Sequence, residues 1–182
     1  MIYNREAAAR DAAINTAKQM AAAAVTAPKG CGNDNIEVLI LDGEDKDTLA
    51  NIMRDIAKET GADFFTRDAC NVDNSFCILF IGAKDNPIAL DNCGLCGFEN
   101  CGKTKEAGAN CAFNITDLGI AVGSAVSVAA DNRIDNRVLF SAGKAAVKMK
   151  CFSDNVKVVY GIPLSVSAKS VFFDRDPGNV MV

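Results

Sequence analysis

Phe76-Cys77-Ile78-Leu79-Phe80-Ile81 is a continuous apolar run with the length of one β-strand. A strand with one face in solvent alternates apolar and polar residues, and this run does not alternate. We therefore expect a central strand that is buried on both faces. Such a strand needs a cover on each side of its sheet, so the rest of the chain should supply flanking helices.

The chain before this strand predicts a helix, a strand and a second helix. Residues 4–26 are rich in Ala, the best helix former, and Pro28 and Gly30 end the expected helix. Residues 36–41 are bounded by turn residues and predict a strand. The second helix is expected because apolar residues recur at helical spacing before a C-cap glycine, Gly61: Leu49, Ile52, Met53, Ile56 and Ala57. We expect Phe64-Phe65 to begin a short strand.

The chain after residue 113 predicts two more helices and a last strand. One helix should begin at Thr116 or Asp117 and run to about Ala130. Another should occupy about 134–150. Val156 to Tyr160 predicts a strand that Gly161-Ile162-Pro163 ends. Strands and helices mixed around one core predict an α/β or α+β domain.

Composition excludes several classes of function. The 182 residues include 19 Lys and Arg against 23 Asp and Glu, and they contain no Trp. This acidic balance argues against a nucleic-acid surface, which needs a basic stripe with aromatic platforms. The chain also has no histidine, which excludes Ser-His and Cys-His catalytic couples and a His-ligated zinc site. No catalytic residue can be assigned from the sequence.

The sequence favours a cytoplasmic protein without a membrane span. Arg5 and Glu6 stand near the start, so no apolar export signal forms there. The longest charge-free run of the second half, Leu118 to Ala130, is shorter than the roughly 20 residues that cross a bilayer.

Residues 91–113 interrupt the pattern of helices and strands. This stretch is rich in Cys, Gly and Asn and shows neither a helical nor a strand period. We expect residues 1–90 and 114–182 to form one domain, and residues 91–113 to form a cysteine-rich insert that its metal folds.

Four of the eight cysteines lie in this insert: Cys93, Cys96, Cys101 and Cys111. In ferredoxin-type sites a Cys-x2-Cys loop directs two thiolates to one cluster, and further cysteines complete the set. Gly94, Gly97 and Gly102 let the chain wrap closely around such a group. The spacing therefore predicts a [4Fe–4S] cluster on the four cysteines, with Lys103 and Lys105 offsetting part of its negative charge.

Other metals remain open at this stage. Cys-x2-Cys-Gly also forms zinc knuckles, so a four-cysteine zinc site without redox activity is the main alternative. A second Cys-x2-Cys pair, typical of such zinc sites, is missing. A mononuclear iron site and a [2Fe–2S] centre are further alternatives.

The whole chain resembles the uncharacterised ferredoxin-domain-containing proteins of anaerobic bacteria and archaea. The likeness is carried by three segments: the Cys93–Cys101 run Cys-Gly-Leu-Cys-Gly-Phe-Glu-Asn-Cys, the start Asp117-Leu118-Gly119-Ile120-Ala121, and the stretch from Gly161-Ile162-Pro163-Leu164-Ser165 to Phe173-Asp174-Arg175. The resemblance implies an iron–sulfur redox protein, either an electron carrier or a component of an oxidoreductase. Its partner would be a redox protein or a flavin.

A weaker resemblance links the rest of the chain to FMN-dependent nitroreductases. It rests on the order of the elements and on the loop Ala27-Pro28-Lys29-Gly30-Cys31 with Asn33. It implies an α+β fold with a mixed sheet flanked by helices. In that fold the loop after the first helix and a basic residue near the C-terminus face FMN, which here implies Lys29, Gly30, Asn33 and Lys169.

A homodimer is also expected. Gly119, Gly123 and Ser127 lie four residues apart on one face of the expected 117–130 helix, which is either a core helix or a subunit-interface helix. The tail Val180-Met181-Val182 is apolar, and nitroreductase-like proteins are commonly intertwined dimers. We expect an interface that includes this helix or the Ala-rich first helix.

Overall fold

Strand β2 (Cys77–Lys84) lies inside a four-stranded sheet of order β1-β2-β4-β3 in the computed structural model, which describes residues 2–173. Its neighbours β1 (Ile36–Asp42) and β4 (Val156–Ser165) both run antiparallel to it, and β3 (Asp135–Asn136) pairs antiparallel with β4. Asp174 and Arg175, which end the third resemblance segment, and the tail Val180-Met181-Val182 lie outside the described residues.

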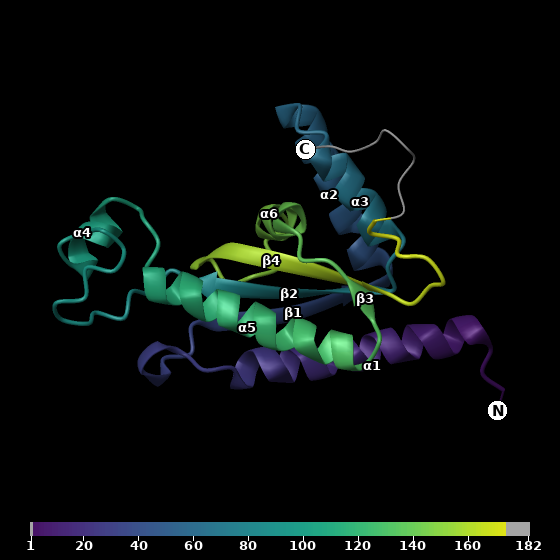
Figure 1. Ribbon diagram of the computed structural model, residues 1–182. Helices are drawn as coiled ribbons and strands as arrows, with labels where there is room; N and C mark the ends of the chain where they lie inside the picture. The colour runs from purple at the N-terminus through teal and green to yellow at the C-terminus, as the bar shows by residue number, and fades with distance from the viewer. Residues whose placement is uncertain (1, 174–182) are drawn as a thin grey trace.

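Helices cover both faces of this sheet (Figure 1). Helices α1 (Arg5–Thr26) and α5 (Ala112–Asp131) pack on one face. The other face carries α2 (Gly43–Thr60), α3 (Phe64–Asp73) and α6 (Phe140–Met149). Along β2, Leu79 and Ile81 join the first core cluster, and Ile78 and Phe80 join the second. The predicted central strand and the α+β fold are confirmed, whereas the sheet, expected to be mixed, is antiparallel at every pairing of the described strands.

Three expectations around the second core cluster are wrong. Phe64-Phe65 begins helix α3 rather than a strand, because Phe65, Asp68, Ala69 and Val72 form a buried face at helical spacing. The helix expected over 134–150 begins only at Phe140, since Leu139 still pairs with Gly161 of β4. The strand expected to end at Gly161-Ile162-Pro163 continues to Ser165.

Helix α6 and strand β4 approach one another closely, which explains a glycine in the middle of the helix. A Cβ atom at Gly143 would lie 1.7 Å from the carbonyl oxygen of Val159. Any side chain at this position would push α6 away from the sheet.

Helix α5 also differs from its expected start. It begins at Ala112, with Cys111 as its N-cap residue, instead of at Thr116 or Asp117. Within the described residues it is the one helix long and apolar enough to cross a bilayer. Here it packs on the sheet through a fully buried stripe: Leu118, Ala121, Ala125 and Ala129. Gly119 and Gly123 face outward, and nothing lies within 4 Å of a Cβ placed on either.

The insert leaves the sheet at the end of β2 and returns at α5. Its one helix is α4 (Cys101–Glu106), and within 91–113 just Thr104 and Cys111 are buried. Its two ends meet in an asparagine clamp, formed by Asn35, Asn86 and Asn114. Asn114 donates hydrogen bonds to the carbonyls of Lys84 (3.0 Å) and Asn86 (2.9 Å), and Asn35 donates to Asn114 Oδ1 (3.3 Å).

Candidate functional site

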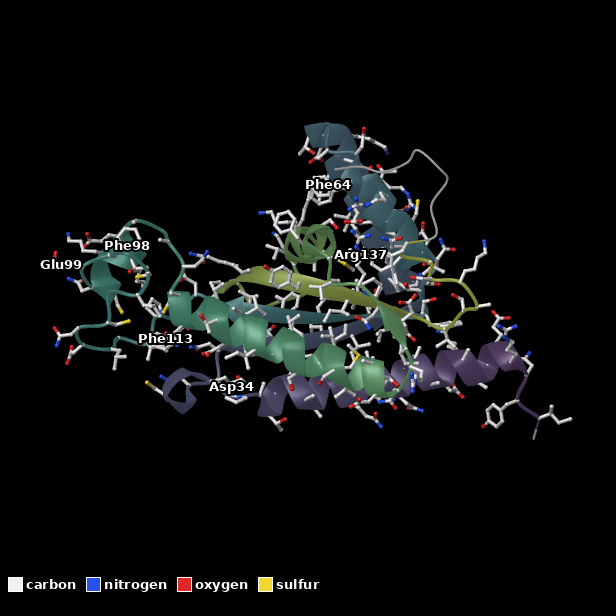
Figure 2. All side chains as sticks on the ribbon, viewed as in Figure 1. Asp34, Phe64, Phe98, Glu99, Phe113 and Arg137 are labelled. Atoms are coloured by element: carbon white, nitrogen blue, oxygen red, sulfur yellow. The ribbon has the colours of Figure 1, made fainter. Side chains whose placement is uncertain are left out.

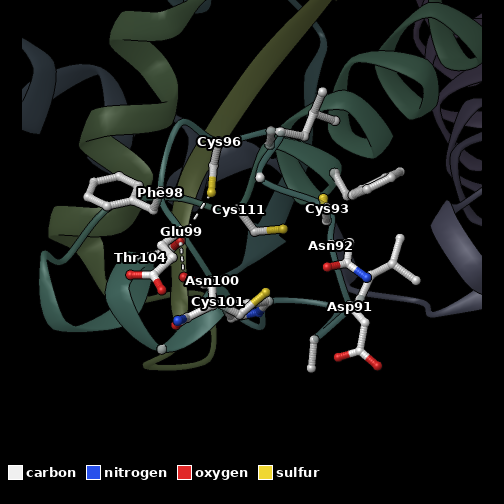
Figure 3. Close-up of a pocket in the computed structure, with 18 residues that line it drawn as sticks. Asp91, Asn92, Cys93, Cys96, Phe98, Glu99, Asn100, Cys101, Thr104 and Cys111 are labelled. Atoms are coloured by element: carbon white, nitrogen blue, oxygen red, sulfur yellow. Dashed lines mark hydrogen bonds between the residues drawn. The ribbon is translucent and has the colours of Figure 1, made fainter.

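Four cysteines of the insert line one cavity of about 370 Å³. Figure 3 shows the sulfur atoms of Cys93, Cys96, Cys101 and Cys111 around this hollow. Cys101 is the first residue of α4, and Cys111 immediately precedes α5. Gly94 and Gly97 hold the turn that carries the other two, with φ of +56° and +84°. The structure therefore brings together all four predicted metal ligands.

The four thiols surround the cavity, but their sulfur atoms do not converge on one position. Within residues 2–173, no group of three Cys, Asp or Glu side chains is close enough to hold a single metal ion. The four cysteines nevertheless suit a group larger than a single ion, such as a cluster bound by thiolates, because all four line one cavity.

Cys96 has the best-defined hydrogen-bonding environment of the four. Its Sγ lies 3.0 Å from the hydroxyl of Thr104, a residue that is 1% exposed (dashed line in Figure 3). Hydrogen bonds from this hydroxyl and from the Phe98 backbone lower the pKa of the Cys96 thiol, because they stabilise the thiolate. Thr104 lies three residues after Cys101, so both belong to one face of α4.

Cys111 is the most buried of the four cavity cysteines and has a different setting. It is 7% exposed and lies at the N-terminal end of the 20-residue helix α5. Cys111 is therefore positioned by the first turn of a long helix that packs on the sheet.

The cavity lining is acidic. Asp91 and Glu99 contribute carboxylates, and no Lys or Arg is among the lining residues. Lys103, which was expected to offset negative charge, donates instead to Glu106 at 2.9 Å on the outer side of α4. A negatively charged group bound here would therefore keep most of its charge uncompensated by side chains.

The loop after α1 packs against the base of the insert. The short 3-10 helix η1 (Gly30–Gly32) begins at Gly30, where a Cβ would lie 2.9 Å from the Phe113 ring. The Gly30 N–H donates to both carboxylate oxygens of buried Asp117, at 3.0 and 3.1 Å. Figure 2 shows Phe113 at the base of the insert, on the side of the loop that carries Asp34. Phe113 also lines the cysteine cavity, so this loop and the cavity share a wall.

Lys29 has a clear structural role in this loop. Its Nζ donates to three carbonyls at the C-terminal end of α1, those of Ala24 (3.0 Å), Val25 (2.6 Å) and Ala27 (2.8 Å). An ammonium has three donors, so all of them are engaged. Asn33 is exposed just after η1.

Lys169 lies at the other end of the sheet. The loop 27–35 adjoins the Lys84 end of β2, where the Lys84 N–H donates to Asn35 O. Lys169 follows the end of β4, which pairs with the Cys77 end of β2. Those ends are about 25 Å apart, since β2 has 8 residues at about 3.3 Å each. One chain therefore does not bring Lys169 together with Lys29, Gly30 and Asn33 (Figure 1).

Several residues of the site carried too little signal to be found in the sequence. Nothing in the sequence marks Thr104 or Asp117 as part of the site, because their hydrogen-bond partners, Cys96 and Gly30, lie in other turns or elements. Asn100 did carry a signal, because it stands where an N-cap is needed and its side chain accepts the Lys103 N–H.

The comparisons with known proteins identify a family and a fold. A family model described as an uncharacterized protein containing a ferredoxin domain matches residues 107–175. An uncharacterized protein of Archaeoglobus fulgidus is 45% identical over 166 residues, which cover 87% of this chain and 89% of that protein. The chain belongs to this ferredoxin-domain family. The matched range includes Cys111 and begins after the other three cavity cysteines, so the assignment of those three rests on spacing and geometry.

Solved structures show that this ferredoxin-domain protein has a nitroreductase-like fold. A nitroreductase with bound FMN from Desulfitobacterium hafniense matches with a TM-score of 0.58 at 12% identity, over 100% of this chain and 85% of that one. The hypothetical oxidoreductase YcnD from Bacillus subtilis matches with a TM-score of 0.57 at 15% identity, over 86% of this chain. The match spans 58% of the length of YcnD. At these identities the likeness concerns the fold.

Proposed function

We propose that this ferredoxin-domain protein transfers single electrons through one [4Fe–4S] cluster held by Cys93, Cys96, Cys101 and Cys111. The observation that carries the proposal is the cavity, which all four cysteines line from three separate turns and helix starts. A fold shared with oxidoreductases supports a redox role.

The spacing of the donors favours a cluster over zinc. Zinc binds four thiolates at about 2.3 Å, which places the sulfur atoms about 4 Å from each other. No three potential ligands in residues 2–173 are grouped so tightly. In a cluster each thiolate binds a different iron, so the sulfur atoms stand farther apart around a larger volume.

A cluster in this cavity would supply the one-electron chemistry, and the chain would set its environment. Phe98 and Phe113 give the cavity part of its apolar lining, while Asp91 and Glu99 place negative charge beside it. Nearby negative charge opposes the addition of an electron, so we expect a low reduction potential. We place the protein in the cytoplasm, where thiols stay reduced, and expect a redox protein to dock at the exposed insert.

A flavin is a second candidate cofactor, and it would need two copies of the chain. Gly30 and Asn33 lie at one end of strand β2 and Lys169 follows the other end, about 25 Å away along the strand. A homodimer could join the loop of one chain to Lys169 of the other. The observation that favours it is the fold, which this chain shares with a nitroreductase that has bound FMN. Because Gly30 packs against Phe113, a flavin in this loop would lie beside the cluster cavity.

Anaerobic purification followed by metal, sulfide and flavin analysis tests the main proposal. We expect a brown protein with broad absorption near ~400 nm, as thiolate-bound iron implies, and about four iron and four sulfide per chain. A colourless protein with one tightly bound zinc would replace the redox proposal with a zinc-stabilised module.

Light scattering tests the homodimer on which the flavin site depends. A mass near twice 19.2 kDa is expected for the wild type. Gly123→Leu, which puts a large side chain on the outward face of α5, should then yield monomers or aggregates. A wild-type mass near that of one chain would remove the shared flavin site.

A further inference from the structure

Among residues 2–173, the hydroxyl of Thr104 is the one side-chain donor within hydrogen-bond distance of a cavity cysteine. Its Oγ1 lies 3.0 Å from Cys96 Sγ and 3.2 Å from the carbonyl oxygen of Asn100. The side chain is 1% exposed, so water does not compete for the hydroxyl. Its position is fixed by α4, on the helical face that also carries Cys101.

A hydroxyl has one proton and can donate it to one of these two acceptors at a time. When Cys96 is a thiol, it can donate its own proton to Thr104, and the hydroxyl can donate to Asn100. A Cys96 thiolate has no proton to give, so the hydroxyl gains a charged acceptor on the sulfur. The Asn100 carbonyl loses nothing essential in this exchange, because it also accepts the backbone N–H of Thr104 at 3.2 Å.

We propose that Thr104 is a positioning residue that donates an O–H···S hydrogen bond to metal-bound Cys96 and thereby raises the reduction potential of the centre. This inference rests on the proposed function. Reduction adds negative charge that the ligand sulfurs share, and a donor to sulfur stabilises the reduced form more than the oxidised form. Thr104 opposes the effect of Asp91 and Glu99 from inside the same cavity.

Three variants separate the hydroxyl from the rest of the side chain. Thr104→Val keeps the shape and removes the donor, Thr104→Ser keeps the donor, and Thr104→Ala removes both without crowding the cavity. Thr48→Val is the matched control, because Thr48 also donates to a backbone carbonyl, that of Glu44, but on the exposed surface of α2. Each protein is loaded anaerobically with iron and sulfide, and its midpoint potential is measured by spectroelectrochemistry alongside iron content.

We expect Thr104→Val and Thr104→Ala to shift the midpoint potential to more negative values at unchanged iron content. Thr104→Ser and Thr48→Val should match the wild type. Loss of the cluster from the Val and Ala variants, with Thr104→Ser retaining wild-type content and potential, would also support the hydrogen bond.

Two results would overturn the inference. One is an unchanged potential in Thr104→Val at full iron content. The other is loss of the cluster from Thr104→Ser as well, which would make the side chain a packing element. Wild-type protein that binds no iron would instead overturn the proposed function itself, and with it the inference that rests on it.

Discussion

At the scale of single residues, the cysteines of this chain divide by their surroundings. Cys77 is completely buried in the core strand, and burial raises the pKa of its thiol to about 12. The four insert cysteines instead line a cavity of mixed polar and apolar residues in the mostly exposed insert. Only the second setting suits a metal-bound thiolate, because a thiol in an apolar core resists ionisation.

Single serine substitutions at the four cavity cysteines should remove most of the bound iron, since each would lose one of four thiolate ligands. The measurement is iron and sulfide content per chain after anaerobic loading. Cys70→Ser is the matched control, because Cys70 is an exposed cysteine on α3, away from the cavity. The assignment of ligands would be wrong if Cys70→Ser lost as much iron as Cys96→Ser.

The raised pKa of Cys77 predicts a loss of stability in alkali. The pKa of its thiol is 9.0 in the unfolded chain and about 12 in the folded one. Below pH 9 both states keep the proton, so this group contributes its full share to the free energy of unfolding. Above pH 9 the unfolded chain releases the proton and the folded chain keeps it. The contribution of this group then falls by about 1.4 kcal/mol per pH unit until the folded pKa is reached.

Urea unfolding of metal-free, reduced wild type and Cys77→Ala between pH 8 and 10.5 measures this contribution. Other titrating groups cancel in the difference between the two proteins. The free energy lost on substitution should shrink as the pH rises above 9. A difference that stays constant over this range would contradict the raised pKa.

At the scale of elements, the asparagine clamp joins β2, α5 and the segment before β1. Asn114 is 2% exposed and donates to two carbonyls, those of Lys84 and Asn86, from the inside of the clamp. Asn114→Ala should therefore lower the free energy of unfolding by about 1–3 kcal/mol. Asn132→Ala is the control, because Asn132 donates to the Val128 carbonyl at the exposed end of the same helix. Equal losses in the two variants would show that the clamp adds nothing.

The elements also show where sequence patterns suffice. The run Phe76–Ile81 predicted a central strand because consecutive apolar residues indicate burial on both faces. Helix α3 was missed because one position of its buried face is Asp68, a polar residue. Its carboxylate accepts hydrogen bonds from Ser141 (2.6 Å) and Arg67 (2.8 Å). A partner 73 residues away along the chain leaves no local pattern.

The site likewise has features that the sequence predicts and features that it does not. Cysteine spacing predicted which four side chains share a cavity, because the ligands of one centre follow each other closely along the insert. The contacts of Lys29 and Thr104 depend on how turns and helix ends meet in space, and residue types alone do not encode them. The resemblance to nitroreductases implied that Lys29 and Lys169 face the same flavin, whereas the strand register places the two residues at opposite ends of the sheet.

At the scale of the whole molecule, the two core clusters contain no residue of the insert. Removal of the metal should therefore loosen the insert and leave the sheet and its helices folded, because metal binding supplies the folding free energy that a core would otherwise provide. Hydrogen exchange before and after anaerobic chelation measures this. Faster exchange should be confined to residues 87–110, with β2 and β4 unchanged. Global unfolding on chelation would show that insert and core are one unit.

The two ends of the insert meet at Asn86 and Asn114. A chain without the residues between them would need only a short turn to join β2 to α5. A gene could therefore acquire or discard the entire cysteine module in one insertion or deletion, with every strand pairing intact, since added loop length costs little entropy. Descendants of such a chain could exchange one redox module for another while they inherit the same scaffold.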